Sequence, residues 1–287
     1  PEGPALIMRE IRLPRAALGL LIGAGLGLSG AALQGYLRNP LAEPGLIGIS
    51  GSAALGAVLA LYTGLSAAFP LALPLAALAG AFAATLLVQA LAGAGSSSIT
   101  LILAGLAVSS FASALTALVL NLAPNPFAAS EIVHWLLGSL ADRSLPQLAL
   151  AGPFILAGGA LLLGLGRALD ALTLGEDAAA SLGVSLARVR TLAVAGSALA
   201  VGAGVAVAGA IGFVGLIVPH LLRPLVGHRP SRLLPASALG GAALLLAADV
   251  AVRLIAPERD LKLGVVTALV GAPFFLRLVW RHRRSLA

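Results

Sequence analysis

Few side chains in this sequence are of a type that could do chemistry, and their spacing narrows what that chemistry is. Asp249 and Arg253 stand four residues apart, so on a helix they lie one turn apart on the same face. An acidic residue in an apolar segment is a candidate proton or ion site. A cation one turn away instead favours an ion pair at a helix end, and we expect Asp249 to be paired with Arg253.

Metal and covalent chemistry find no support in the residue pattern. His134 and His220 have no second histidine or carboxylate at ligand spacing, and the chain has no cysteine. Hydrolytic triads and paired carboxylates are also missing from the sequence. We therefore expect no catalytic residue, no metal site and no cofactor in this chain. A single polar residue in an apolar run, such as Gln34, is expected to form a hydrogen bond between helices.

Neither of two glycine-rich nucleotide-binding patterns supports a nucleotide site in this sequence. The P-loop pattern G-x-x-x-x-G-K-[ST] occurs nowhere, so the chain cannot bind ATP through a P-loop of its own. GLGLSG, residues 25–30, does match G-x-G-x-x-G, but it lies inside an apolar run with no strand before it. Its small residues predict close approach of helix backbones. The glycines of GAIGFVGLIVPHLLR, residues 209–223, are expected to do the same.

Two turns contain residues that could close a pore. RNPLAEPGLIG, residues 38–48, has two prolines and two glycines and predicts a rigid, non-helical turn. GAGSSSIT, residues 93–100, is the next polar turn on the same side. Non-helical backbone near membrane depth persists only where it is buried or lines a cavity. Both turns are therefore candidate gates, although a plain polar loop also explains the second.

The stretch LTLGEDAAASLGVSLARVR, residues 172–190, predicts a short surface helix followed by a basic one. Thr173 and Glu176 form a T-x-x-E capping box at its start. Gly183 suits a helix C-cap. Because a simple connector is seldom capped at both ends, we interpret this stretch as a grip for a cytoplasmic partner.

The elements that position these residues are membrane helices. Hydrophobic residues make up 59% of the chain and charged residues 10%, with a mean hydropathy of +1.03, whereas a soluble domain has about 25% charged residues. We expect an all-α, polytopic membrane protein with one transmembrane domain over residues 1–287. The apolar runs predict nine spans, at 16–37, 46–62, 71–92, 99–121, 147–166, 190–208, 210–227, 233–252 and 264–280. Residues 129–140 are too short to cross and predict a re-entrant or interfacial helix.

The basic residues indicate which end of the molecule faces the cytoplasm. With the C-terminus inside, 11 of the 18 basic residues fall on the inner side and 7 on the outer side. The inner ones are Arg38, Arg167, Arg188, Arg190, Arg223, Arg229, Arg232, Arg277, Arg281, Arg283 and Arg284; the outer ones are Arg9, Arg12, Arg15, Arg143, Arg253, Arg259 and Lys262. The outer residues either snorkel among lipid headgroups or dock an acidic external protein.

Seven motifs follow one another in an order that resembles a known family. They are RLPR, GAALQG, NPLAEPGLIGIS, LGEDAAASLGV, GFVGLIVPHLLR, ADVAVR and LGVVTALVGAPFF. Together, from about Arg12 to the C-terminus, they resemble the FecCD-like permease subunit of ABC importers for iron chelates, haem and cobalamin. The resemblance implies the type II importer fold with ten spans, of which the first would precede RLPR and be missing here.

The same resemblance implies partners and a location. Such permeases form homodimers in the bacterial inner membrane and receive substrate from a periplasmic binding protein. Two cytoplasmic ATPase subunits bind ATP and Mg, so the permease itself is expected to be non-catalytic. WLLGSLADRS and LKLGVVTALVGAPFFL look most like haem-transporting members. Ferric siderophore and cobalamin are the alternative substrates, and an ion-coupled secondary transporter is the alternative function. His134 would contact haem iron only if it faces the pathway.

Residues are carried over from the family by motif. The resemblance implies that Arg12, Arg15 and Arg253 pair with glutamates of the binding protein. It further implies coupling to the ATPase through Gly175, Glu176, Asp177, Ala178 and Gly183, and a cytoplasmic gate at Asn39, Leu41, Ser97, Ser98 and Ile99. One departure stands at residues 260–264, where many relatives read E-L-P-[VI]-G and this chain has Lys262 in place of the proline.

Overall fold

The computed structural model describes residues 2–69, 71–93, 98–255 and 261–282, and every regular element in these ranges is helical. The elements are α1 (Glu2–Ile7), η1 (Met8–Arg12), α2 (Leu13–Leu37), η2 (Pro44–Ile47), α3 (Ile49–Tyr62), α4 (Leu65–Ala68), α5 (Ala72–Ala92), α6 (Ser98–Asn121), α7 (Pro126–Leu136), α8 (Leu145–Leu163), α9 (Gly166–Leu172), α10 (Glu176–Ser181), α11 (Leu186–Ala208), α12 (Val214–Leu222), η3 (Arg223–Val226), α13 (Pro230–Ile255) and α14 (Leu263–His282). The expected all-α class is confirmed for the described part of the chain.

Seven helices of the described residues are long and apolar enough to cross a membrane. They comprise the continuous helix Gly3–Leu37, together with α5, α6, α8, α11, α13 and α14. The other two predicted spans correspond to shorter apolar helices, α3 and Val214–Val226. The structure thus supports seven spans by length and composition, and the total of nine stays a prediction.

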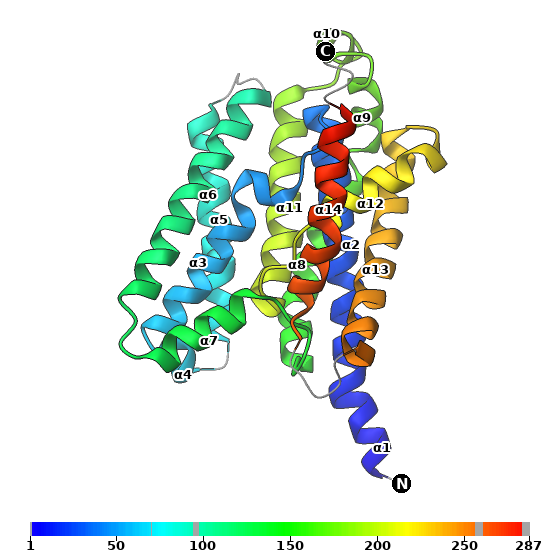
Figure 1. Cartoon of the computed structure of the whole chain (residues 1–287). Coiled ribbons are helices and arrows are strands. Elements are labelled where there is room, and N and C mark those ends of the chain that lie inside the picture. The colour runs from blue at the N-terminus through cyan, green and yellow to red at the C-terminus, as the bar shows by residue number, and fades with distance from the viewer. Residues whose placement is uncertain (1, 70, 94–97, 256–260, 283–287) are drawn as a thin grey trace.

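The long helices run side by side (Figure 1). Helices α1, α4 and α7 lie at the lower end of the view, and α10 lies at the upper end. The short helix predicted around residues 129–140 is present as α7, 11 residues long. The distribution of basic residues predicts that the lower end faces outward and the upper end faces the cytoplasm.

Helix α2 lies at the centre of the packing and contacts α8, α11, α12 and α13. Its small residues allow the close approach that GLGLSG predicts. A Cβ atom on Gly27 would collide with the carbonyl of Ser237 in α13, and one on Gly30 would collide with the carbonyl of Gly215 in α12. Gly25 is likewise packed against Ala200 of α11. The packing prediction is confirmed, and α2 has no room for larger side chains on these faces.

The predicted helix at 210–227 is wrong in its first part. Helix α11 ends at Ala208 and α12 begins only at Val214, so the chain between them is non-helical. Gly209 and Phe213 both take left-handed backbone, with φ of +74° and +68°. Gly209 is therefore needed for its conformation as well as its size, while Gly212 has open space around it. The break shortens α12 to 9 residues.

Backbone groups from three distant segments meet at this break. The N–H of Ser139 donates to the Ala208 carbonyl at 2.7 Å, and the N–H of Gly264 donates to the Gly138 carbonyl at 3.3 Å. The first bond satisfies a carbonyl that the interrupted helix leaves without a partner, and the second ties the start of α14 to the same loop. Lys262, at the departure from the family pattern, precedes α14, and its carbonyl accepts from Val265 at 3.1 Å. Residues 256–260 of this loop lie outside the described part.

Candidate functional site

Helix α10 stands at the upper end of the molecule as a short, exposed turn (Figure 1). The predicted capping box is wrong, because Gly175 and not Thr173 is the N-cap residue, with a φ of +106°. The Thr173 hydroxyl instead donates to the Asp170 carbonyl at 2.6 Å. The Glu176 carboxylate binds Arg38, whose Nη2 donates to Oε1 at 3.0 Å.

The predicted end of α10 at Gly183 is confirmed. Gly183 has a φ of +85°, and the N–H of Val184 donates back to the Ala179 carbonyl at 3.0 Å. This is the bond that closes a helix ended by a left-handed glycine. The five residues expected to couple to an ATPase therefore lie on α10 or at its two ends: Gly175, Glu176, Asp177, Ala178 and Gly183. Ala179 is buried and anchors the turn to the bundle.

The first expected gate segment follows α2 directly. Arg38 takes left-handed backbone, with a φ of +49°, and turns the chain out of the helix. The Asn39 side chain accepts from the N–H of Leu41 at 2.9 Å, and the N–H of Ala42 donates to the Asn39 carbonyl at 3.1 Å. Asn39 and Leu41 thus belong to one tight turn. We call residues 39–41 the gate turn.

The second expected gate segment is only partly described. Ser97 lies outside the described residues, Ser98 is the first residue of α6, and Ile99 is 68% exposed. The side chains of the two segments therefore give no contact from which a closed gate can be argued. The assignment of Ser97, Ser98 and Ile99 remains an expectation.

Beyond the gate turn the chain passes close to the break before α12. The Pro44 ring lies 3.2 Å from the position of a Cβ on Gly215, and the Glu43 carboxylate interacts with the backbone N–H of Phe213. Burial raises the pKa of Glu43 above its ordinary value, and the Phe213 N–H partly offsets that rise. The Ser109 hydroxyl donates to the Gly45 carbonyl at 3.1 Å and fixes the same segment to α6.

A polar contact between helices joins α2 to the region of α12. The buried Gln34 amide donates to the carbonyls of Gly215 and Leu216 at 3.3 and 3.4 Å. Its oxygen accepts from Arg223 Nη2 at 2.6 Å. The expectation that Gln34 forms hydrogen bonds between helices is confirmed. Arg223 has a polar neighbour here, as its place near the helix end predicts.

The two histidines singled out by the sequence take part in packing and local bonding. The His220 ring meets Phe274 of α14 edge to face, with ring centroids 5.6 Å apart. The Nδ1 atom of His134 lies 2.8 Å from the carbonyl of Ser130, one turn earlier in α7, and the residue is exposed. Within the described residues no three metal-ligating side chains come together.

The three arginines that were expected to dock an external protein lie toward the lower end, where the predicted Asp249–Arg253 pair is confirmed and Arg15 is a second partner of Asp249. Arg15 Nη2 donates to Asp249 Oδ1 at 2.7 Å and Arg15 Nε to Oδ2 at 3.0 Å. Arg253 Nη2 lies 3.4 Å from Oδ2. The Asp249 side chain is 5% exposed, and those of Arg15 and Arg253 are 21% and 50% exposed. Arg15 is thus the closer partner of Asp249 and Arg253 the more distant one.

This arrangement separates the roles of the three arginines. Arg15 is mostly buried and is paired with the Asp249 carboxylate of its own chain, so its charge is neutralised inside the protein. Arg12 is exposed, and half of Arg253 is exposed. Of the three arginines that were expected to dock an external protein, Arg12 and Arg253 are the two with exposed cations. The sequence contained no signal for the Arg15 contact, because the two residues are 234 positions apart.

A polar cavity of about 480 Å³ also opens near this end, between α4, α5, α7, α8 and α11. Glu131, Trp135, Arg143 and Gln147 lie among its lining residues. Burial lowers the pKa of the Arg143 guanidinium, and the neighbouring Asp142 partly offsets this. Arg143 Nε also donates to the Ser139 carbonyl at 3.4 Å, which ties it to the loop after α7.

Comparison with known proteins gives one consistent result. The profile of the FecCD transport family matches residues 2–281. The cobalamin import system permease protein BtuC of Halobacterium salinarum is 42% identical over 97% of this chain and 74% of its own length. The hemin transport system permease protein HmuU of Yersinia pestis is 37% identical over 97% of this chain and 84% of its own length. A solved structure, described as an inward-facing conformation of a metal-chelate type ABC transporter, superposes with a TM-score of 0.90 at 36% identity, covering 98% of this chain and 89% of that one.

Proposed function

This chain belongs to the FecCD transport family, and on that premise we propose that it is the permease subunit of an ATP-driven ABC importer for a chelate-type substrate. The observation that carries the proposal is the similarity over nearly the whole chain to import permeases and to an ABC transporter structure. The two ends of the molecule fit it, with exposed cations at the lower end and the capped turn α10 at the upper end.

Each end has a partner in this proposal. A periplasmic binding protein docks at the lower end, where Arg12 and Arg253 meet its acidic side chains and Arg15 supports Arg253 through Asp249. Two cytoplasmic ATPase subunits bind ATP and Mg and contact α10, while the chain itself is non-catalytic. The protein works as a homodimer in the bacterial inner membrane, and the gate turn with residues 97–99 closes the pathway.

Haem is the substrate that we propose first, on the likeness of residues 135–144 and 261–276 to haem-transporting members. Ferric siderophores and cobalamin are the alternatives, and relatives named for cobalamin and for hemin match the chain over the same 97% of its length. A binding screen of the cognate periplasmic protein against haem, ferric siderophores and cobalamin decides among them. Binding of a siderophore alone would refute haem.

The competing function is an ion-coupled secondary transporter, which needs an ionisable residue that can exchange protons or ions in the membrane. Asp249 is the candidate, but two guanidinium groups hold it. We expect uptake into proteoliposomes to need the ATPase partner and internal ATP. Uptake driven by a pH gradient in the absence of ATP would contradict the importer.

A further inference from the structure

One ion pair joins the turn after α2 to the exposed helix α10. Arg38 Nη2 donates to Glu176 Oε1 at 3.0 Å, across 138 residues of sequence. The two side chains are 49% and 45% exposed. An ion pair this open to solvent adds little to the stability of a fold. What distinguishes it is its position, because it joins the two segments that the proposed function assigns to the gate and to the ATPase contact.

The gate turn is short and held by hydrogen bonds within it, so its backbone has little conformational freedom. The N–H groups of Arg38 and Asn39 both donate to the Gln34 carbonyl in the last turn of α2. The Asn39 side chain then holds the N–H of Leu41 at 2.9 Å. A displacement of Arg38 is therefore passed on to Asn39 and Leu41, since no flexible residue separates them.

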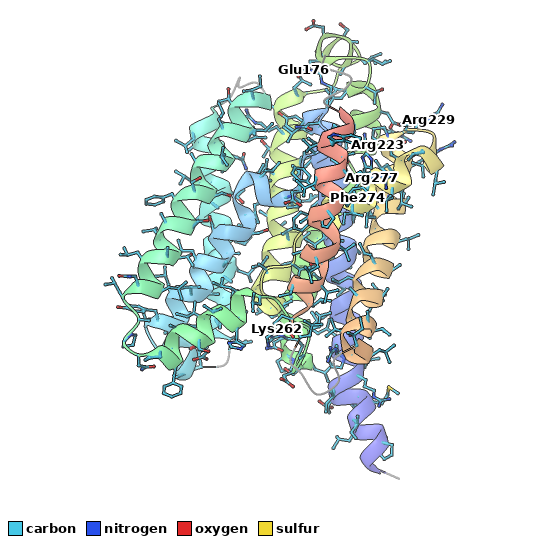
Figure 2. The ribbon with its side chains drawn as sticks, viewed as in Figure 1. Glu176, Arg223, Arg229, Lys262, Phe274 and Arg277 are labelled. Atoms are coloured by element: carbon cyan, nitrogen blue, oxygen red, sulfur yellow. The ribbon has the colours of Figure 1, made fainter. Side chains whose placement is uncertain are left out.

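The other half of the pair stands on an element that a partner can move. Glu176 is the first residue of α10, and Figure 2 shows it at the upper end of the molecule, beyond the helices of the bundle. Left-handed glycines flank the helix at positions 175 and 183. Glycine tolerates large changes of backbone angle, so α10 can pivot at these two glycines about its buried Ala179. Its Glu176 carboxylate moves with it.

We propose that the Arg38–Glu176 pair transmits the movement of α10 to the gate turn, which makes both residues positioning residues of the transport cycle. The inference rests on the function proposed above, in which an ATPase moves α10. When α10 is displaced, the Arg38 guanidinium follows the Glu176 carboxylate and carries Asn39 and Leu41 with it. With one of the two charges reversed, less of the movement of α10 reaches the gate turn.

The experiment uses the absence of cysteine from this chain. Leu41→Cys places a single thiol in the gate turn, and the permease–ATPase complex is reconstituted in lipid nanodiscs. The rate of reaction with a water-soluble maleimide is measured with and without Mg-ATP. We expect ATP to change this rate. Arg38→Glu and Glu176→Arg should each reduce the ATP-dependent change about two- to fivefold, the range for an exposed ion pair.

The charge-swapped double variant Arg38→Glu/Glu176→Arg distinguishes the effect of the ion pair from any other role of the two residues. We expect it to restore the ATP-dependent change, whereas a loss of ATPase contact at residue 176 cannot be repaired from residue 38. Arg229→Glu is the matched control, because Arg229 is an exposed arginine at the same end of the molecule (Figure 2) but outside the gate turn and α10. It should leave the change intact.

Two results would overturn the inference, and they are distinguishable. If the single variants keep the full ATP-dependent change, or the double variant fails to restore it, the pair does not transmit movement, and the proposed function still stands. If ATP leaves the reactivity of Leu41→Cys unchanged in the complex with Arg38 and Glu176 intact, the ATP-driven gate itself is refuted, and the inference with it.

Discussion

Asp249 shows how much a single residue depends on helix packing. Its side chain is 5% exposed and contacts guanidinium groups from two helices, Arg15 of α2 and Arg253 of α13. Charges this deeply placed persist only when they are paired and hydrogen-bonded. The residue therefore stabilises the lower end of the bundle, and the same contact sets the position of the Arg253 side chain.

Asp249→Asn is expected to lower the stability of the permease by about 2–4 kcal/mol, because Arg15 is left mostly buried without a counter-ion. The measurement is the thermal unfolding midpoint in detergent. Glu10→Gln is the control, since the Arg9–Glu10 pair is 3.8 Å apart with side chains 79% and 48% exposed. The control should change stability by less than about 0.5 kcal/mol. Equal effects of the two variants would contradict the buried pair.

Glu43 makes a prediction about pH. Its folded-state pKa is raised by burial, so its contribution to stability is fully present below the unfolded value of about 4.3 and is lost as the pH rises through the folded-state pKa. Glu43→Gln removes this dependence. We expect the variant to gain stability over the parent protein as the pH is raised from about 4.5 to about 8. A difference in unfolding midpoint that does not vary with pH would contradict it.

At the scale of the helices, small residues decide how close α2 comes to its neighbours. Gly23 and Gly27 of α2 face Gly241 and Ser237 of α13 across a contact between backbones. Without a hydrophobic driving force inside the bilayer, such close packing is a main source of helix association. The interrupted helix at 209–213 is the other departure from regular spans, and bonds to the backbone near residues 138–139 hold it.

Gly27→Ala tests this packing. The added Cβ would meet the Ser237 carbonyl, so α2 and α13 must separate, and we expect a loss of about 1–3 kcal/mol. Gly51→Ala is the matched control, because Gly51 is also helical and nothing lies within 4 Å of its Cβ position. The control should be neutral or slightly stabilising. Thermal unfolding of the two variants side by side decides the matter, and equal midpoints would refute the close contact.

Charged, exposed residues of the molecule lie toward its two ends. In Figure 2, Lys262 lies in the lower part of the bundle. Four other charged residues lie toward the upper end: Glu176, Arg223, Arg229 and Arg277. The distribution of basic residues predicted the same division from the sequence. In the proposed importer this polarity separates the delivery of substrate from the use of ATP, and a binding protein and an ATPase never compete for one surface.

Reversing the exposed outer cations tests this division. Arg12→Glu/Arg253→Glu should abolish the stimulation of ATPase activity by the binding protein, because acidic side chains would then face the docking partner. Arg229→Glu at the opposite end should leave that stimulation in place. Size-exclusion chromatography of the permease–ATPase complex shows whether the variant still folds and assembles. Undiminished stimulation in the double variant would refute docking at these residues.

The sequence predicted the features that depend on neighbours along the chain. Helical class, the short helix expected at 129–140 and found at 126–136, the close packing around Gly27 and the end of α10 at Gly183 all follow from local composition or spacing. The pairs Arg15–Asp249, Arg38–Glu176 and Gln34–Arg223 span 234, 138 and 189 positions. Their formation depends on which faces of the helices meet. The capping box at Thr173 was wrong because Gly175 offered a different helix start.

In the proposed importer, the ion triad at the lower end also affects how quickly the docked binding protein dissociates. A carboxylate that arrives from outside has to share the Arg253 guanidinium with Asp249, which already lies 3.4 Å from it. The resident carboxylate acts as a competitor that never diffuses away. It lowers the affinity of the surface for an acidic partner and shortens the residence time of that partner, since most differences in affinity lie in the dissociation rate. A carrier protein that must deliver and depart in every cycle benefits from such a weak hold.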